Sequence, residues 1–117
     1  LGTKMPEAIR EMVEIIWSPR SIKDIEEIAE YIAKDSLQYA SAYVSLFFEK
    51  AKVLENHPLS GRAVPELGNA SIRQLLCDRY RIIYEVISKK KIGILTVHHQ
   101  SRLLKNNPAI KRRMRNK

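Results

Sequence analysis

The spacing of hydrophobic residues in the first half of the chain predicts one strand followed by two helices. In residues 12–17 the apolar side chains of Val13, Ile15 and Trp17 fall at every second position and share one side, which is typical of a β-strand. Ser18 can cap a helix, and apolar residues then continue at helical spacing to about Lys34. A second amphipathic helix begins near Ser36 and ends before Pro58. Helices separated by so short a break are expected to form an antiparallel hairpin.

Three further strands are expected in the second half of the chain. Residues 57–71 contain several glycines and prolines and little periodicity, so they are predicted to be a loop. Short apolar and aromatic runs follow over residues 72–77, 79–87 and 92–99. The resulting order, β-α-α-β-β-β, predicts an α+β domain in which the helical hairpin packs on one face of a mainly antiparallel four-stranded sheet. The other face is expected to stay open to solvent or to a partner.

The third of the four predicted strands carries charged residues between its core positions. In the sequence DRYRIIYEV, residues 78–86, successive side chains point to opposite faces of the sheet. Tyr80 and Tyr84 are therefore expected in the core, together with the apolar residues that share their face. Arg79 and Arg81 are expected on the opposite face, where they would serve an active site or a partner.

Composition favours a single intracellular domain. A chain of 117 residues is long enough to bury one core without cross-links. Cys77 is the only cysteine in the sequence, so no disulfide can form within the chain, and a reducing, cytoplasmic setting is expected. We interpret Cys77 as a buried and inert thiol. No apolar run approaches the roughly 20 residues of a membrane span.

Positive charge is concentrated in the second half of the chain. Residues 1–57 have a net charge of −3 and residues 58–117 a net charge of +11, within a total of +8. We expect residues 12–103 to form the core and residues 104–117 to form a basic tail that adds nothing to it. The tail is either a solvated end or a segment that binds nucleic acid. Its candidate nucleic-acid-binding residues are Lys105, Lys111, Arg112, Arg113 and Arg115.

The sequence contains no standard catalytic or cofactor motif. It has no phosphate-binding loop, no dinucleotide-binding glycine motif and no nucleophile elbow. His98 and His99 are adjacent on a predicted strand and face opposite ways, so they cannot easily share an ion. We therefore expect neither a metal site nor a cofactor.

The predicted sheet would instead bring basic side chains together on one side. These residues are Arg73, Arg81, His99 and Arg102. Such a cluster could hold a phosphodiester, with the arginines stabilising charge on phosphorus and His99 moving a proton. Alternatively, the arginines pair with carboxylates of a partner or of the first helix.

Five segments between Val13 and Leu103 carry a family resemblance. They are VEIIWSPRSIKDIEEIAEYIAKDS, HPLSGRAVPELG, IRQLL, RYRIIYEV and ILTVHHQSR. Together they resemble the RelE/ParE superfamily, the toxin halves of bacterial and archaeal type II toxin–antitoxin modules. The segment HPLSGRAVPEL is more similar to the ParE branch, also called plasmid stabilisation proteins, than to the RelE branch. The family fold has the same order of elements as the one predicted above.

The resemblance implies two different activities. RelE-like members cut messenger RNA in the ribosomal A site, whereas ParE-like members poison DNA gyrase. A RelE-like chain would be a metal-independent endoribonuclease with Arg73, Arg81, His99 and Arg102 as its catalytic residues. Arg81 and Arg102 match RelE arginines and Arg73 lies near a RelE lysine, but Leu75 stands where another lysine is expected. No tyrosine follows Arg102, so an aromatic residue that stacks on the substrate base is missing.

Three functions follow from these observations. The first is a ParE-like toxin that acts on DNA gyrase and is neutralised by a cognate antitoxin. The second is a RelE-like nuclease acting on the ribosome and its mRNA. The third is a non-toxic family member that binds only its antitoxin and, through it, operator DNA. The resemblance implies an acidic antitoxin that wraps the toxin, and its candidate contacts are Arg79, Arg81, Tyr31, Leu46 and Phe48.

Overall fold

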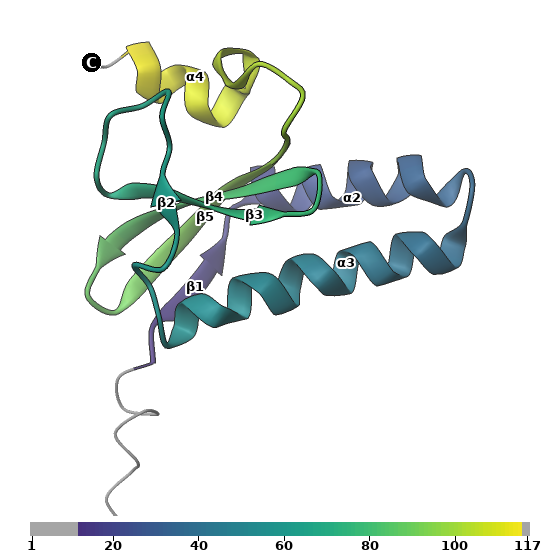
Figure 1. Cartoon of the computed structure of the whole chain (residues 1–117), viewed down its shortest axis with the longest axis horizontal. Helices are drawn as coiled ribbons and strands as arrows, with labels where there is room; N and C mark the ends of the chain where they lie inside the picture. The colour runs from purple at the N-terminus through teal and green to yellow at the C-terminus, as the bar shows by residue number, and fades with distance from the viewer. Residues whose placement is uncertain (1–11, 116–117) are drawn as a thin grey trace, which may run out of the picture.

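Two helices, a five-stranded sheet and a C-terminal helix make up the computed structural model, which describes residues 12–115 (Figure 1). The strands and helices have the bounds β1 (Glu14–Trp17), α2 (Pro19–Ala33), α3 (Leu37–Lys52), β2 (Arg62–Ala63), β3 (Ile72–Cys77), β4 (Tyr80–Ser88), β5 (Lys91–His99) and α4 (Pro108–Arg115). A 3₁₀ turn, η1 (Val53–Glu55), follows α3, and another, η2 (Leu104–Asn106), precedes α4.

Each helix of the hairpin begins after a serine, as the sequence predicts for both. The Ser18 hydroxyl accepts a hydrogen bond from the backbone N–H of Ser21 at 3.0 Å, and the Ser36 hydroxyl accepts one from that of Tyr39 at 3.0 Å. Helices α2 and α3 run antiparallel beside the sheet (Figure 1). No helix within residues 12–115 is long and apolar enough to cross a membrane.

The sheet has the strand order β1-β5-β4-β3-β2. Strand β1 runs parallel to β5, whereas the other neighbouring pairs are antiparallel, so the sheet is mainly antiparallel as predicted. The predicted count of four strands is wrong, because Arg62 and Ala63 pair with Gln74 and Arg73 as an additional edge strand. A two-residue strand shows no alternation, and this one lies in a segment that glycine and proline mark as a loop.

The main core lies between the helical hairpin and the sheet. Apolar side chains from β1, α2, α3, β3, β4 and β5 form one continuous cluster there. Phe47 and Leu54 contribute from the α3 side, and Ile82 and Tyr84 from β4, all of them fully buried. The predicted alternation along β4 is therefore confirmed for its core face, and the hairpin packs where the sequence places it.

A second apolar cluster covers the opposite face of the sheet. Ile72 and Ile83 from the sheet pack there with Val64 and Leu67 from the loop before β3, and with Ile110 of α4. Figure 1 shows α4 on the side of the sheet away from α3. The expectation of an open face is therefore wrong. The expectation that the tail adds nothing to the core is also wrong, because Leu104 and Ile110 are almost completely buried.

The error about the tail has a simple physical cause. Four basic residues in α4 make its average polarity high, but helix packing depends on one stripe of side chains. Ile110 and Met114 are four positions apart and therefore share a face of the helix. Both contact the second cluster, while Lys111 and Arg112 remain exposed. A single buried turn is sufficient to hold the helix on the sheet.

Candidate partner-binding cleft

The four residues predicted to form a basic catalytic cluster do not come together. Arg73 is paired with Tyr84 in the β3–β4 register and therefore shares the helix-covered face of the sheet with that core residue. Arg81 is paired with His98 across β4 and β5, on the face that α4 covers. The predicted convergence of Arg73 and Arg81 is wrong, because the two arginines lie on opposite sides of the sheet.

Arg81 is held by an intramolecular ion pair. Its guanidinium donates to both carboxylate oxygens of Glu66, at 3.0 and 2.8 Å, and to the side-chain oxygen of Gln74 at 3.2 Å. The Arg81 side chain is only 11% exposed. These hydrogen bonds hold the pKa of Glu66 below its ordinary value. The expected open, partner-facing position of Arg81 is therefore wrong: its charge is already matched within the chain.

Arg73 fixes the loop that follows α3. Its guanidinium donates to the backbone carbonyls of Leu59 and Gly61, at 3.2 and 2.9 Å. The buried Tyr84 hydroxyl accepts from the N–H of Gly61 and donates to the carbonyl of Pro58, both at 2.9 Å. A Cβ on residue 61 would lie 2.5 Å from this hydroxyl, so the position requires glycine. The contacts of Arg73 are therefore structural, because its guanidinium holds the loop at Leu59 and Gly61 in place.

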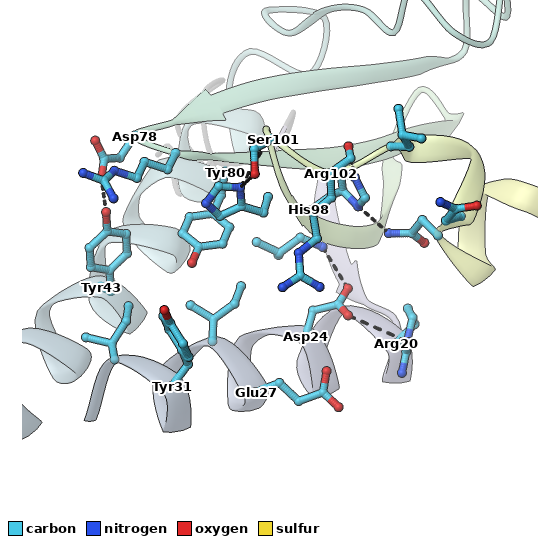
Figure 2. A pocket seen from close by; sticks show the side chains of 18 of the residues that line it. Arg20, Asp24, Glu27, Tyr31, Tyr43, Asp78, Tyr80, His98, Ser101 and Arg102 are labelled. Carbon is cyan, nitrogen blue, oxygen red and sulfur yellow. Dashed lines mark hydrogen bonds and ion pairs between the residues drawn. The ribbon is translucent and has the colours of Figure 1, made fainter. Parts of the chain in front are cut away.

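His99 and Arg102 lie elsewhere, in a cleft of about 1060 Å³ between the helical hairpin and the sheet, where β4 begins and β5 ends. Figure 2 shows Tyr31 on the helical side of this cleft and Tyr80 on the sheet side. Arg79 also lines the cleft, but it lies in the turn before β4 rather than on the strand as predicted. The cleft therefore brings together four predicted site residues, which are Tyr31, Arg79, His99 and Arg102.

The turn at the rim of the cleft is fixed by α3. Asp78 has a positive φ of 54°, which allows the tight connection from β3 to β4. The Tyr43 hydroxyl donates a hydrogen bond to the Asp78 carboxylate, and Tyr43 packs edge-on against Tyr80 at 5.9 Å between ring centroids. This contact holds the turn in place and so fixes the backbone position of Arg79, the next residue in the turn.

Charge is distributed unevenly across the cleft. Arg79, His99 and Arg102 line it from the sheet side together with Asp78, whereas Asp24 and Glu27 line it from α2 together with Arg20. Within residues 12–115 the ion pairs are Arg20–Asp24, Arg81–Glu66 and Arg113–Glu85. The two arginines of the sheet side are thus available to carboxylates of another molecule.

His99 is oriented by the chain that follows it. Its Nδ1 atom accepts a hydrogen bond from the backbone N–H of Ser101 at 3.0 Å, so the proton of the neutral ring is on Nε2. The ring packs edge-on against Tyr80, with 5.0 Å between ring centroids. Burial raises the pKa of the Tyr80 hydroxyl, which keeps that group neutral and able to donate a hydrogen bond.

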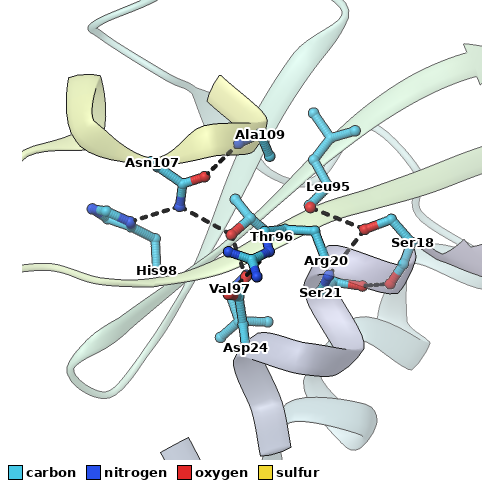
Figure 3. A network of polar contacts seen from close by, with 10 residues as sticks. All are labelled: Ser18, Arg20, Ser21, Asp24, Leu95, Thr96, Val97, His98, Asn107 and Ala109. Carbon is cyan, nitrogen blue, oxygen red and sulfur yellow. Dashed lines mark hydrogen bonds and ion pairs between the residues drawn. The ribbon is translucent and has the colours of Figure 1, made fainter. Parts of the chain in front are cut away.

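Asp24 is a partly buried acidic residue in the lining of the cleft and is not among the predicted site residues. Its carboxylate accepts hydrogen bonds from the Thr96 hydroxyl and, at 3.0 Å, from the backbone N–H of Val97 (Figure 3). Burial raises the pKa of Asp24, although both hydrogen bonds act in the opposite direction. An acidic residue in the first turns of a helix normally indicates a favourable dipole contact, so its sequence position did not reveal this role.

The apolar residues predicted as partner contacts are exposed on the helical hairpin. Tyr31 is 70% exposed at the cleft, and Leu46 and Phe48 are 39% and 40% exposed on α3. Phe48 lies against Trp17, with 4.6 Å between ring centroids. These side chains are therefore accessible, and their role in binding stays a prediction.

The basic residues of the predicted tail are mostly presented on ordered structure. Lys105, Lys111 and Arg112 are exposed, and Arg113 forms an ion pair with Glu85 at 3.3 Å. Arg115 is the last residue of α4. The described residues contain no group of three or more side chains arranged to hold a metal ion. Cys77 is buried, which raises the pKa of its thiol and fits the predicted inert role.

Comparison with known proteins identifies a family and solved structures of similar fold. The family model described as "ParE toxin of type II toxin-antitoxin system, parDE" matches residues 15–104. A solved structure described as "Chromosomal ParDE TA system from P. aeruginosa" has 21% sequence identity and a TM-score of 0.64. That match covers 76% of this chain and 97% of the other chain, and it shows a shared fold. No curated protein matches the chain.

Proposed function

Because the chain belongs to the ParE toxin family of type II toxin–antitoxin systems, we propose that it arrests growth by acting on DNA gyrase and that a cognate antitoxin neutralises it. The family match covers the helical hairpin and every strand from residue 15 onward. Gyrase as the target comes from the resemblance to the ParE branch, and the arrangement of the basic residues supports a toxin that binds rather than cleaves.

The state of Arg81 is the observation that most favours binding over RNA cleavage. A catalytic arginine must present its guanidinium to a phosphate whose charge grows in the transition state. Arg81 instead donates to Glu66 and Gln74 and is largely covered. Arg73 lies on the other face of the sheet, bound to backbone carbonyls. A ribonuclease would have to break both sets of contacts before it could bind its substrate.

The cleft and the hairpin together suit an acidic, partly apolar antitoxin segment. Arg79 and Arg102 provide positive charge on the sheet side, and Tyr31 provides exposed aromatic surface beside them. Leu46 and Phe48 extend the accessible apolar surface along α3. Aromatic and arginine side chains are the residue types that most often dominate protein interfaces. We propose that the antitoxin contacts these five residues.

Controlled expression with parallel readouts tests the proposed target. We expect growth arrest, loss of chromosome supercoiling and no cleavage of mRNA at codon positions. Purified protein should inhibit supercoiling by DNA gyrase and should leave ribosome-bound mRNA intact. Codon-positioned cleavage without any effect on supercoiling would show a RelE-like endoribonuclease. Normal growth with abundant folded protein would show a non-toxic member that binds only its antitoxin and, through it, operator DNA.

Matched variants test the surface assigned to the antitoxin. Arg79→Glu and Arg102→Glu should each weaken antitoxin binding, because they reverse charge on the sheet side of the cleft. Lys89→Glu changes charge equally at an exposed position in the turn between β4 and β5, outside the cleft lining and outside α3, and should leave binding unchanged. Equal affinity of all three variants for the antitoxin would refute the placement of the interface.

A further inference from the structure

A chain of side-chain hydrogen bonds connects α2, β5 and the start of α4 (Figure 3). The Asn107 amide nitrogen donates to the Thr96 hydroxyl at 3.0 Å and to Nδ1 of His98 at 2.9 Å. The Thr96 hydroxyl in turn donates to the Asp24 carboxylate. Asn107 and His98 are both buried, with 8% and 7% exposure, so water offers little substitute for these bonds.

Two backbone groups, the N–H of Ala109 and the carbonyl of Arg102, determine which side-chain atoms of Asn107 and His98 are donors. The N–H of Ala109 is 2.9 Å from the Asn107 side-chain oxygen, and an N–H can only donate. The amide nitrogen of Asn107 must therefore face His98. The carbonyl of Arg102 is 3.0 Å from Nε2 of His98, and a carbonyl can only accept. His98 must therefore carry its proton on Nε2 and leave Nδ1 as an acceptor.

The hydrogen bonds are satisfied only when the His98 ring is neutral. A second proton on Nδ1 would face the amide hydrogens of Asn107, so two donors would oppose each other. Turning the Asn107 amide around would remove this conflict, but its nitrogen would then face the N–H of Ala109. Protonation of His98 therefore removes either its bond to Asn107 or the side-chain cap of α4.

The charged surroundings of His98 come from several elements. Arg81 lies directly opposite on β4, and its partner Glu66 comes from the loop before β3. Asp24, with its ion-pair partner Arg20, approaches from α2 through Thr96. Arg102 itself accepts the Nε2 bond through its backbone carbonyl. Cations and carboxylates both surround the ring, so the arrangement of donors decides which protonation state fits.

We propose that Asn107 and His98 form a protonation-sensitive latch that holds α4 on the sheet while His98 is neutral and releases it when His98 takes up a proton. The helix is vulnerable at this point, because it has only eight residues and packs through few apolar side chains. Release would uncover the apolar residues of the second cluster, Ile83 among them. The latch does not depend on gyrase being the target.

NMR on the full chain tests the latch directly. The ¹⁵N shifts of the His98 ring at pH 7.5 should show a neutral ring with its proton on Nε2. When the pH is lowered from 7.5 to 5.5, amide protection of Ala109, Ile110 and Lys111 should fall. The fall should be roughly 5- to 30-fold, the factor that corresponds to losing a helix cap. Protection in α3 should not change.

Three variants separate the latch from other titrations. In His98→Gln, the side-chain oxygen can accept from Asn107 and the nitrogen can donate to Arg102, so α4 should stay protected at both pH values. In Asn107→Asp, the carboxylate can still cap Ala109 but prefers a protonated His98, so protection should be higher at pH 5.5 than at 7.5. His99→Gln, which changes the neighbouring histidine on the other face, should behave as the parent chain does.

Several results would overturn the latch. One is a His98 ring with its proton on Nδ1 at pH 7.5. A second is a His98 ring that becomes protonated while α4 keeps its full protection. A third is a His98→Gln variant that still loses α4 protection in acid, because the responsible group would then be Asp24 or another carboxyl.

Discussion

Replacing Ile110 with alanine should destabilise the whole domain, because α4 forms part of the second core cluster. Ile110 is fully buried between α4 and the sheet. Truncating a buried isoleucine to alanine costs about 2–5 kcal/mol, from lost burial and from the cavity that remains. We take about 3 kcal/mol, since a short helix near the chain end can relax into part of the space.

The expected change in melting temperature follows from the size of the chain. The entropy of unfolding is roughly 2.1 cal/mol/K per residue, which for 117 residues is about 0.25 kcal/mol/K. A loss of about 3 kcal/mol therefore lowers Tm by roughly 12 °C. Thermal unfolding followed by far-UV circular dichroism measures this shift, and urea titration gives the free energy of unfolding independently.

A matched control keeps the interpretation specific. Leu103→Ala removes an apolar side chain from the same segment, but Leu103 is 62% exposed, so Tm should change little. A drop of less than about 3 °C for Ile110→Ala would mean that α4 contributes under about 1 kcal/mol to the cooperative core. In that case α4 would only rest on the sheet, and the second cluster would not be a core.

Three further predictions concern other parts of the structure. The Arg81–Glu66 pair should stabilise the fold at neutral pH, and this contribution should be lost progressively below about pH 4.3, because the pKa of Glu66 is lowered in the folded chain. In Glu66→Gln, the free energy of unfolding measured by urea titration should therefore vary less with pH over that range. Tyr84→Phe should cost about 1–3 kcal/mol in urea titration, since Gly61 and Pro58 lose their buried partner; an unchanged midpoint would contradict this. Replacing Lys111 and Arg112 together by glutamine should reduce the slope of log K for DNA against log salt by about 1.8, provided that both contact phosphate.

The hydrophobic pattern was sufficient to predict the main architecture. The strand before α2, the two helices and the strands β3, β4 and β5 all produce a strong local signal of period 2 or 3.6. Ser18 and Ser36 marked the helix starts, and Tyr80 and Tyr84 were assigned correctly to the core face of β4. These features depend on neighbouring residues in the chain, so the sequence by itself determines them.

Tertiary structure decided what happens to the charged residues. Alternation placed Arg81 on the second face of the sheet, but Glu66, from a loop without periodicity, binds it there. Arg73 and Arg81 were expected together although they lie on opposite faces, because strand register cannot be read from composition. The same limit applies to His99 and Arg102, which meet Tyr31 only because the helical hairpin folds over the end of β5.

The C-terminal segment shows most clearly what the sequence by itself could not determine. Its basic residues suggested either a solvated tail or a segment that binds nucleic acid. Whether Ile110 is buried depends on an apolar face presented by Ile72 and Ile83, which are 38 and 27 positions away in the chain. Burial is a property of two surfaces that meet, and the sequence of α4 describes only one of them.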